Sequence, residues 1–244
     1  MHLATHGILA RPTATASFSN TKSVDFDGVD DFVDCGQITS LANASLFTIS
    51  GWFNQTTLDQ ERFMFGTYTS VTNLIACYTW SDGKMYIDLR NGAISYGQFD
   101  YSSVVTAGQW FHLAIVYNGS GVDNASKLKL YINGSLQTLS YNLTIPTNIN
   151  ATQGDFRIGC LENYTQEFLG NIDELAIFNS ELSASNVTNI YNSGTPTDLT
   201  SLSPISWWRM GDGDTFPTLT DNGSGSNNGT MTNMVSGDIV TDVP

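Results

Sequence analysis

The sequence predicts an all-β fold, a two-sheet antiparallel sandwich with one short helix. Ser, Thr, Asn and Gly are abundant, and this mixture favours strands joined by many turns. From Ser23 onward, apolar and polar residues alternate in short runs, which is the pattern of half-buried strands. Turn residues separate the runs, as they do between the strands of a sandwich. At 244 residues, with 41% hydrophobic and 13% charged residues, the chain can bury a sizeable core.

Three segments carry the strand pattern most clearly. Residues 84–90 place apolar side chains on one face and polar ones on the other. Residues 127–132 do the same and lead into Asn133-Gly134, a pair that favours a type I′ hairpin turn, with a return strand near 136–139. Residues 110–117 are apolar at nearly every position, which predicts a central strand covered on both faces. Further strands are predicted at 23–27, 46–53, 62–67, 74–80, 155–160, 172–178 and 205–210.

One helix is predicted at residues 183–191. Ser183 is suited to the N-cap, and Val187 and Ile190 have helical spacing. Gly194, followed by a proline two residues later, is expected to end the helix.

The charge balance limits the classes of partner. The chain carries 9 basic and 23 acidic residues, a net charge of −14, which repels phosphate backbones and anionic lipids. We therefore expect neither nucleic acid nor a membrane as a partner. No apolar run approaches the length of a membrane span, and the first residues show no signal peptide. Three widely spaced cysteines predict buried thiols rather than a disulfide framework: Cys35, Cys77 and Cys160.

A set of motifs resembles a known family. The motifs are SVDFDGVDDFV at 23–33, FTISGWF at 47–53, QWFHL at 109–113, LYING at 130–134 and GNIDELAIF at 170–178. In this order they resemble the LamG-like (laminin G type) domain of the concanavalin A-like lectin and glucanase superfamily. The resemblance implies a concanavalin A-like jelly-roll sandwich.

The C-terminal segment departs from the order of that family. Residues 206–213 and 221–230 resemble the piece that usually precedes the FDG strand, yet here they come last. This implies a circularly permuted domain over residues 23–244, in which the segment 205–244 completes the sheets. Residues 1–22 contain basic residues and no acid, and they are predicted to form an N-terminal arm, with a frayed terminus as the alternative.

The sequence disfavours catalysis. The related glucanases carry an E-x-D-x-x-E or E-x-D-x-E strand, and no such motif occurs here. Asp173 and Glu174 are neighbours, so on a regular strand they would point to opposite faces. Two histidines lie in the arm, and His112 lies in an apolar strand, where a core histidine is expected. We therefore predict a protein that is not an enzyme, and a glycoside hydrolase is the weakest alternative.

Aspartates near the first strand suggest a cation site. Five of them fall within ten residues, and hard oxygen ligands suit Ca²⁺. The family resemblance implies a structural calcium ion held by Asp27, Gly28 and Asp173. The alternative is that these aspartates cap turns and face water.

Aromatic residues and one arginine form a candidate ligand-binding surface. They lie on short strands, and aromatic rings on the polar face of a sheet can stack on sugars. The alternative is packing at the core or at a sheet edge. The candidates are Tyr78, Trp80, Tyr86, Arg90 and Tyr96.

These observations predict a non-catalytic binding or adhesion module that recognises a glycan or protein surface. LamG-like domains usually work outside cells, and a chain without a secretion signal can reach the outside on a phage particle. We therefore expect a virion surface component, a capsid decoration or fibre-type protein, whose arm at residues 1–22 contacts an acidic capsid or tail neighbour. A free extracellular carbohydrate-binding lectin is the alternative. Assembly into a homo-oligomer stays open.

Overall fold

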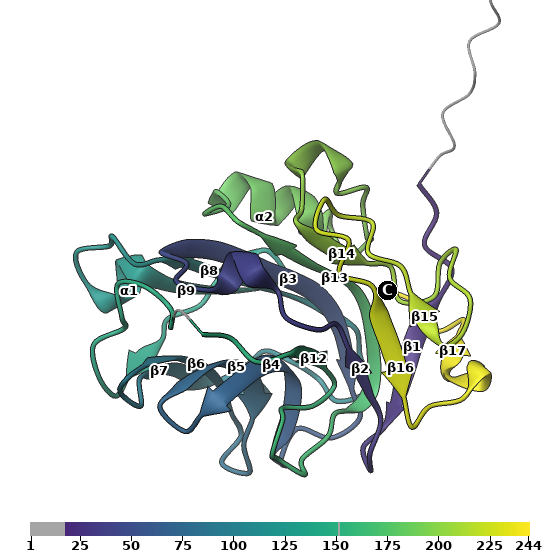
Figure 1. Ribbon diagram of the computed structural model, residues 1–244, viewed down its shortest axis with the longest axis horizontal. Coiled ribbons are helices and arrows are strands. Elements are labelled where there is room, and N and C mark those ends of the chain that lie inside the picture. Colours follow the sequence, from purple (N-terminus) through teal and green to yellow (C-terminus); the bar gives the residue numbers. More distant parts are fainter. Residues whose placement is uncertain (1–17, 151) are drawn as a thin grey trace, which may run out of the picture.

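Two antiparallel sheets pack face to face in the computed structural model, which describes residues 18–150 and 152–244 (Figure 1). The predicted all-β jelly-roll sandwich is confirmed. Sheet A has eight strands and sheet B has nine. Their inner faces form one large hydrophobic core, and smaller apolar clusters cover part of each outer face.

Sheet A is built from segments far apart in the sequence. Its strand order is β10 (Ser135–Leu136), β9 (Leu128–Ile132), β8 (Phe111–Asn118), β3 (Leu46–Gln55), β13 (Leu169–Phe178), β1 (Ser23–Asp27) and β17 (Ile239–Val240). A further strand, β14 (Ser206–Trp208), pairs with the C-terminal half of β13. The segment predicted to be a central strand at 110–117 is β8, which lies between β9 and β3.

Sheet B contains the longest run of neighbours in sequence order. Its strand order is β11 (Ser140–Tyr141), β7 (Tyr96–Asp100), β6 (Lys84–Asn91), β5 (Asn73–Thr79), β4 (Arg62–Ser70), β12 (Phe156–Ile158), β2 (Phe32–Asp34), β16 (Gly229–Thr232) and β15 (Thr218–Leu219). On β6, Met85, Ile87 and Leu89 enter the core, while the residues between them face outward. The predicted alternation is therefore confirmed on this strand.

The predicted helix is α2 (Ala184–Tyr191), which covers the outer face of sheet A with Val187 and Ile190. The Ser183 hydroxyl accepts a hydrogen bond from the Asn186 N–H at 3.1 Å, as expected of an N-cap. The helix ends at Asn192, whose φ is +43°, and not at the predicted glycine. Among the described residues, no helix has both the length and the apolar character to cross a bilayer.

Short helical turns complete the chain and were not predicted. They are α1 (Asn124–Lys127), η1 (Thr39–Leu41), η2 (Tyr101–Ser103), η3 (Thr200–Leu202) and η4 (Ser236–Asp238). The Asp123 carboxylate caps α1 by accepting from the Ser126 N–H at 2.8 Å, so a local polar contact forms this turn.

The hairpin predicted at Asn133-Gly134 is present. Both residues have positive φ, +49° and +73°, as a type I′ turn requires. The return strand β10 is shorter than predicted, because only Ser135 and Leu136 pair with β9.

All three cysteines lie in the described part of the chain, where each is buried with a free thiol. The prediction of buried thiols in place of a disulfide framework is confirmed.

The C-terminal segment supplies strands to both sheets. β14 and β17 belong to sheet A, and β15 and β16 belong to sheet B, where β16 lies beside β2 (Figure 1). Trp208 fixes this segment to the core. Its ring is fully buried and stacks on Phe156 at 6.0 Å, and its indole N–H donates to the Asn227 carbonyl at 2.8 Å.

Trp208→Ala tests whether the C-terminal segment is part of the core. Removing a fully buried aromatic side chain costs about 3–5 kcal/mol of the free energy of unfolding. We expect a loss of this size in urea denaturation, whereas Val122→Ala at an exposed site should change stability little. A Trp208→Ala protein as stable as the parent would contradict this view of the segment.

Candidate functional site

The five predicted ligand-binding residues lie together on the outer face of sheet B. Tyr78 is on β5 and Trp80 follows this strand, Tyr86 and Arg90 are on β6, and Tyr96 is on β7. The strand register places Tyr78 opposite Tyr86, and their rings stack at 5.3 Å with 9° between their planes. Tyr96 contacts the edge of Tyr86 at 5.3 Å.

Three further aromatic residues extend this surface and were not predicted. Phe63 on β4 contacts Tyr78 at 4.9 Å, Tyr164 contacts Phe63 at 4.9 Å, and Tyr68 contacts Tyr164 at 5.8 Å. A register shift after Phe63 gives this side chain its outward direction, as bulges do. We call the whole set the aromatic band: Phe63, Tyr68, Tyr78, Trp80, Tyr86, Tyr96 and Tyr164.

A hollow of about 220 Å³ opens beside the aromatic band. It is lined by Glu61, Phe63, Leu74, Tyr78, Trp80, Asp88, Arg90, Leu161 and Tyr164. Asp88 is 1% exposed; its Oδ2 atom accepts from the Tyr78 hydroxyl at 3.3 Å and pairs with the Arg90 guanidinium. Trp80, at the rim, is 41% exposed.

The electrostatics of the hollow are set by burial. Burial raises the pKa of Asp88 to about 6, and the Arg90 guanidinium keeps it from rising further. Burial also raises the pKa of Glu61 and that of the Tyr78 hydroxyl. At neutral pH, Asp88 is therefore ionised and held against its counter-ion.

This arrangement can bind a small ligand with one apolar face and several hydroxyl groups. Aromatic rings pack against C–H groups, and the exposed face of Trp80 is free to do so. Asp88 and Arg90 supply an acceptor and donors for hydroxyl groups. The volume of the hollow is below that of a site for a drug-sized ligand, so the hollow suits a ligand with one ring rather than a chain of several rings.

The implied calcium ligands do not form one site. Asp27 pairs with Leu169 across β1 and β13, and Val24 pairs with Ile172. Asp173 therefore lies four residues beyond Leu169 on β13. Because a strand rises about 3.3 Å per residue, Asp173 is about 13 Å from Asp27 along the strand direction.

The turn after β1 has other partners for its oxygens. The Gly28 carbonyl accepts from the Arg62 guanidinium at 3.0 Å, which already supplies a positive group there. Asp27 accepts from the Val29 N–H at 2.8 Å, and Asp31 accepts from the Asp27 N–H at 3.0 Å. In these hydrogen bonds the aspartates cap the turn, as the alternative to calcium binding predicts. Oxygens of Asp27, Asp30 and Asp31 nevertheless lie within 4.8 Å of one another.

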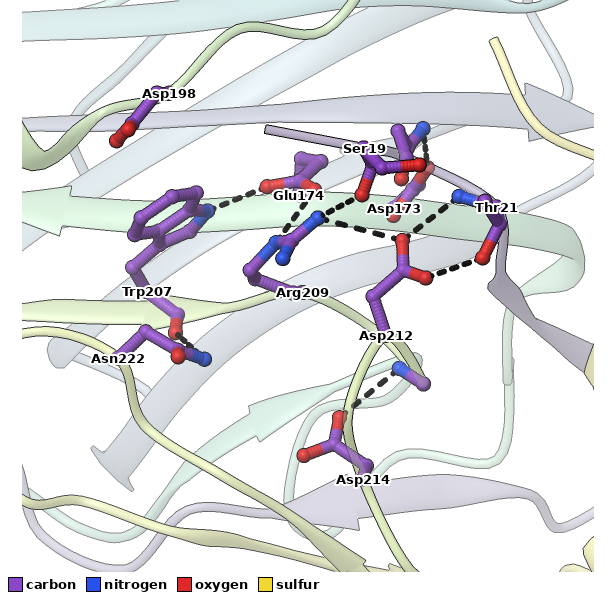
Figure 2. Close-up of polar contacts among 12 residues, drawn as sticks. Ser19, Thr21, Asp173, Glu174, Asp198, Trp207, Arg209, Asp212, Asp214 and Asn222 are labelled. Carbon is purple, nitrogen blue, oxygen red and sulfur yellow. Dashed lines mark hydrogen bonds and ion pairs between the residues drawn. The ribbon is translucent and has the colours of Figure 1, made fainter. Parts of the chain in front are cut away.

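A second buried polar cluster surrounds Asp173 on the outer face of sheet A (Figure 2). The Trp207 indole N–H donates to Glu174 at 2.5 Å, and the Arg209 Nε–H donates to the other Glu174 oxygen at 3.2 Å. Burial raises the pKa of Glu174 to about 7, and burial together with Glu174 raises the pKa of Asp173 well above its usual range. The pair therefore carries less than its full negative charge at neutral pH.

The expected opposite orientation of Asp173 and Glu174 is wrong. A bulge interrupts the pairing of β13 with β3 between Asp173 and Ala176, and Glu174 adopts a φ of +49°. The extra residue turns Glu174 to the same face as Asp173. A regular strand would have separated them.

Residues just before β1 cover this cluster. The Thr21 N–H donates to Asp212 at 2.8 Å (Figure 2). The Asn20 amide donates to Asp173 at 2.7 Å, and Phe18 stacks on Trp207 at 6.2 Å. Residues 18–22 of the predicted arm therefore pack against the domain. Residues 1–17 lie outside the described residues.

Calcium binding stays a prediction, and it is testable at the turn after β1. Carboxylates brought close together repel one another unless a cation lies between them, so Ca²⁺ should raise the melting temperature relative to EDTA-treated protein. Asp30 makes no side-chain contact that the turn needs, so Asp30→Asn should remove the calcium effect without unfolding the protein. An unchanged melting temperature in EDTA would exclude a structural calcium ion.

Glu174→Gln tests the buried cluster through pH. Because folding raises the pKa of Glu174 from 4.5 to about 7, this group favours the folded state at low pH, and its contribution is lost as pH rises from about 5 to 7.5. Glu174→Gln should flatten the fall in the free energy of unfolding over that window. Glu181→Gln is the control, because hydrogen bonds from Lys129 and Asn118 lower the pKa of Glu181. Equal slopes for the parent and Glu174→Gln would contradict the assignment.

Comparison with solved structures finds the same fold at low identity. A protein from Bacteroides ovatus, provisionally described as carbohydrate-binding, has a TM-score of 0.63 and 16% identity, covering 93% of this chain and 62% of its own. The CBM40 of a Ruminococcus gnavus IT-sialidase, bound to α2,3 sialyllactose, has a TM-score of 0.57 and 12% identity, covering 72% and 100%. A heptameric SAP-like pentraxin from Limulus polyphemus has a TM-score of 0.50 and 18% identity, covering 70% and 82%.

No curated protein matches the chain. A family model described as the concanavalin A-like lectin/glucanases superfamily matches residues 27–188. The range holds four of the five motifs of the LamG-like resemblance and part of the first, at 23–33, and it ends before the C-terminal segment, whose strands the structure builds into both sheets. Since the match spans well over half of the chain, the protein belongs to the concanavalin A-like lectin/glucanases superfamily.

Proposed function

We propose that this protein is a non-catalytic glycan-binding module whose ligand occupies the hollow on the outer face of sheet B. The observation that carries the proposal is the aromatic band beside a buried carboxylate and guanidinium pair. A sugar ring has an apolar face and a rim of hydroxyl groups. The hollow offers a surface of each kind.

The comparisons support this proposal at the level of the fold. A CBM40 with the same fold is bound to a sialylated sugar, and the superfamily includes lectins. At such low sequence identity the ligand does not transfer with the fold. The chemistry of the hollow therefore carries the proposal.

A binding role fits the hollow better than glycoside hydrolysis. A nucleophilic carboxylate must be free to attack, whereas Asp88 is held by Tyr78 and Arg90. The other close carboxylates, Asp173 and Glu174, are both buried, and residues 18–22 cover them. A glycan cannot reach this second pair without displacing the chain above it.

The setting in which the module works stays a prediction. We propose a virion surface component that recognises host glycans, with a free lectin as the alternative. The packing of residues 18–22 limits any anchoring arm to the residues before Phe18.

Trp80→Ala tests the glycan-binding function. Loss of the exposed ring should lower affinity for the best glycan on an array about 10-fold, which corresponds to about 1.4 kcal/mol. Affinity is measured by titration calorimetry of the purified protein. Trp110→Ala, a half-buried tryptophan that does not line the hollow, is the matched control. Unchanged affinity in Trp80→Ala, or no glycan bound by the parent, would refute the proposal.

A further inference from the structure

Asp88 and Arg90 both line the hollow, and each has one buried polar atom that lacks a partner. Asp88 Oδ1 is buried without a hydrogen bond, although Oδ2 of the same carboxylate is fully engaged. Arg90 Nε is likewise buried without a partner, although the two terminal nitrogens bind the Val71 carbonyl and Asp88. An unpaired buried polar group destabilises the protein, and more so when it is charged. A ligand that pairs both atoms recovers this cost.

Hydroxyl groups match this pair of atoms. Each hydroxyl donates one hydrogen bond and also accepts, so two neighbouring hydroxyls can give a proton to Asp88 Oδ1 and accept one from Arg90 Nε. A carboxylate only accepts. It could bind Arg90 Nε, but it would leave Asp88 Oδ1 unpaired and place two negative charges side by side.

The charge around the hollow also disfavours a ligand that carries a carboxylate. Glu61 and Asp88 both line it, and Arg90 is the only cationic side chain that does so among the described residues. The charge of Arg90 is already balanced by Asp88. At the nearby end of β6, the Asp82 carboxylate accepts from the Tyr86 hydroxyl at 2.9 Å and pairs with Lys84 at 3.5 Å, so this group adds no net charge, and Glu61 supplies the excess negative charge of the lining. An anionic sugar would therefore enter against a net negative charge.

We propose that the hollow selects an uncharged sugar unit with a pair of neighbouring hydroxyl groups and rejects sugars that carry a carboxylate. This inference rests on the proposed glycan-binding function and names the class of its ligand. It separates this chain from the CBM40 that shares its fold and is bound to sialyllactose. Asp88 determines the specificity, and the exposed ring of Trp80 supplies the stacking surface.

The test is a glycan array that holds neutral glycans together with their sialylated and uronic acid counterparts, followed by calorimetry of matched pairs. The parent protein should bind the neutral member of each pair at least 10-fold more tightly. Asp88→Asn keeps the shape of the side chain but removes its charge. It should therefore weaken the binding of neutral glycans about 10-fold and reduce the preference for neutral over acidic glycans. Asp100→Asn, an exposed aspartate at the end of β7, should change neither quantity.

A second variant keeps the buried pair intact. Glu61→Gln removes one negative charge from the lining and should raise affinity for the acidic member of a pair. Melting temperatures of all variants show that they are folded. Equal or tighter binding of acidic glycans by the parent, or unchanged preference in both Asp88→Asn and Glu61→Gln, overturns the inference while the glycan-binding function stands. A parent that binds no glycan overturns the function itself, and the inference with it.

Discussion

The period-two alternation of β5 and β6 links the fold to the candidate site. Met85, Ile87 and Leu89 must enter the core, so the residues between them must face outward. A slip of one residue would send the charged side chains into the core and the aliphatic ones to the surface. The core thus determines which side chains line the hollow, and the pairing of β5 with β6 then sets Tyr78 beside Tyr86.

Local patterns in the sequence were sufficient for most of the architecture. The alternation along β6, the Asn133-Gly134 turn and the Ser183 cap each depend on residues close together in the chain. The short strands of the C-terminal segment are different. β15, β16 and β17 have few residues, and their pairing partners include distant strands, so little in their own sequence distinguishes them from loop.

Some residues of the candidate site could likewise be predicted from local sequence patterns, and others could not. Tyr78, Trp80 and Tyr86 could be identified because aromatic residues recur on strands whose outward face is polar. Tyr164 and Glu61 lie outside regular strands, and only the tertiary fold brings them to the hollow. The role of Asp88 was also missed, since its burial and its pairing with Arg90 depend on neighbouring strands. The calcium ligands implied by the family are not brought together, because Asp27 and Asp173 lie at different levels of β1 and β13.

The place of the chain ends has a practical consequence. Asn20 and Thr21 contact sheet A and Asp212, and β1 pairs with the last strand, β17, at one edge of that sheet. The hollow lies on the outer face of the opposite sheet. A carrier, bead or sensor surface joined to the C-terminus would therefore lie on the side of sheet A, away from the hollow. Attachment through the C-terminus would thus leave the hollow accessible in an assay with immobilised protein.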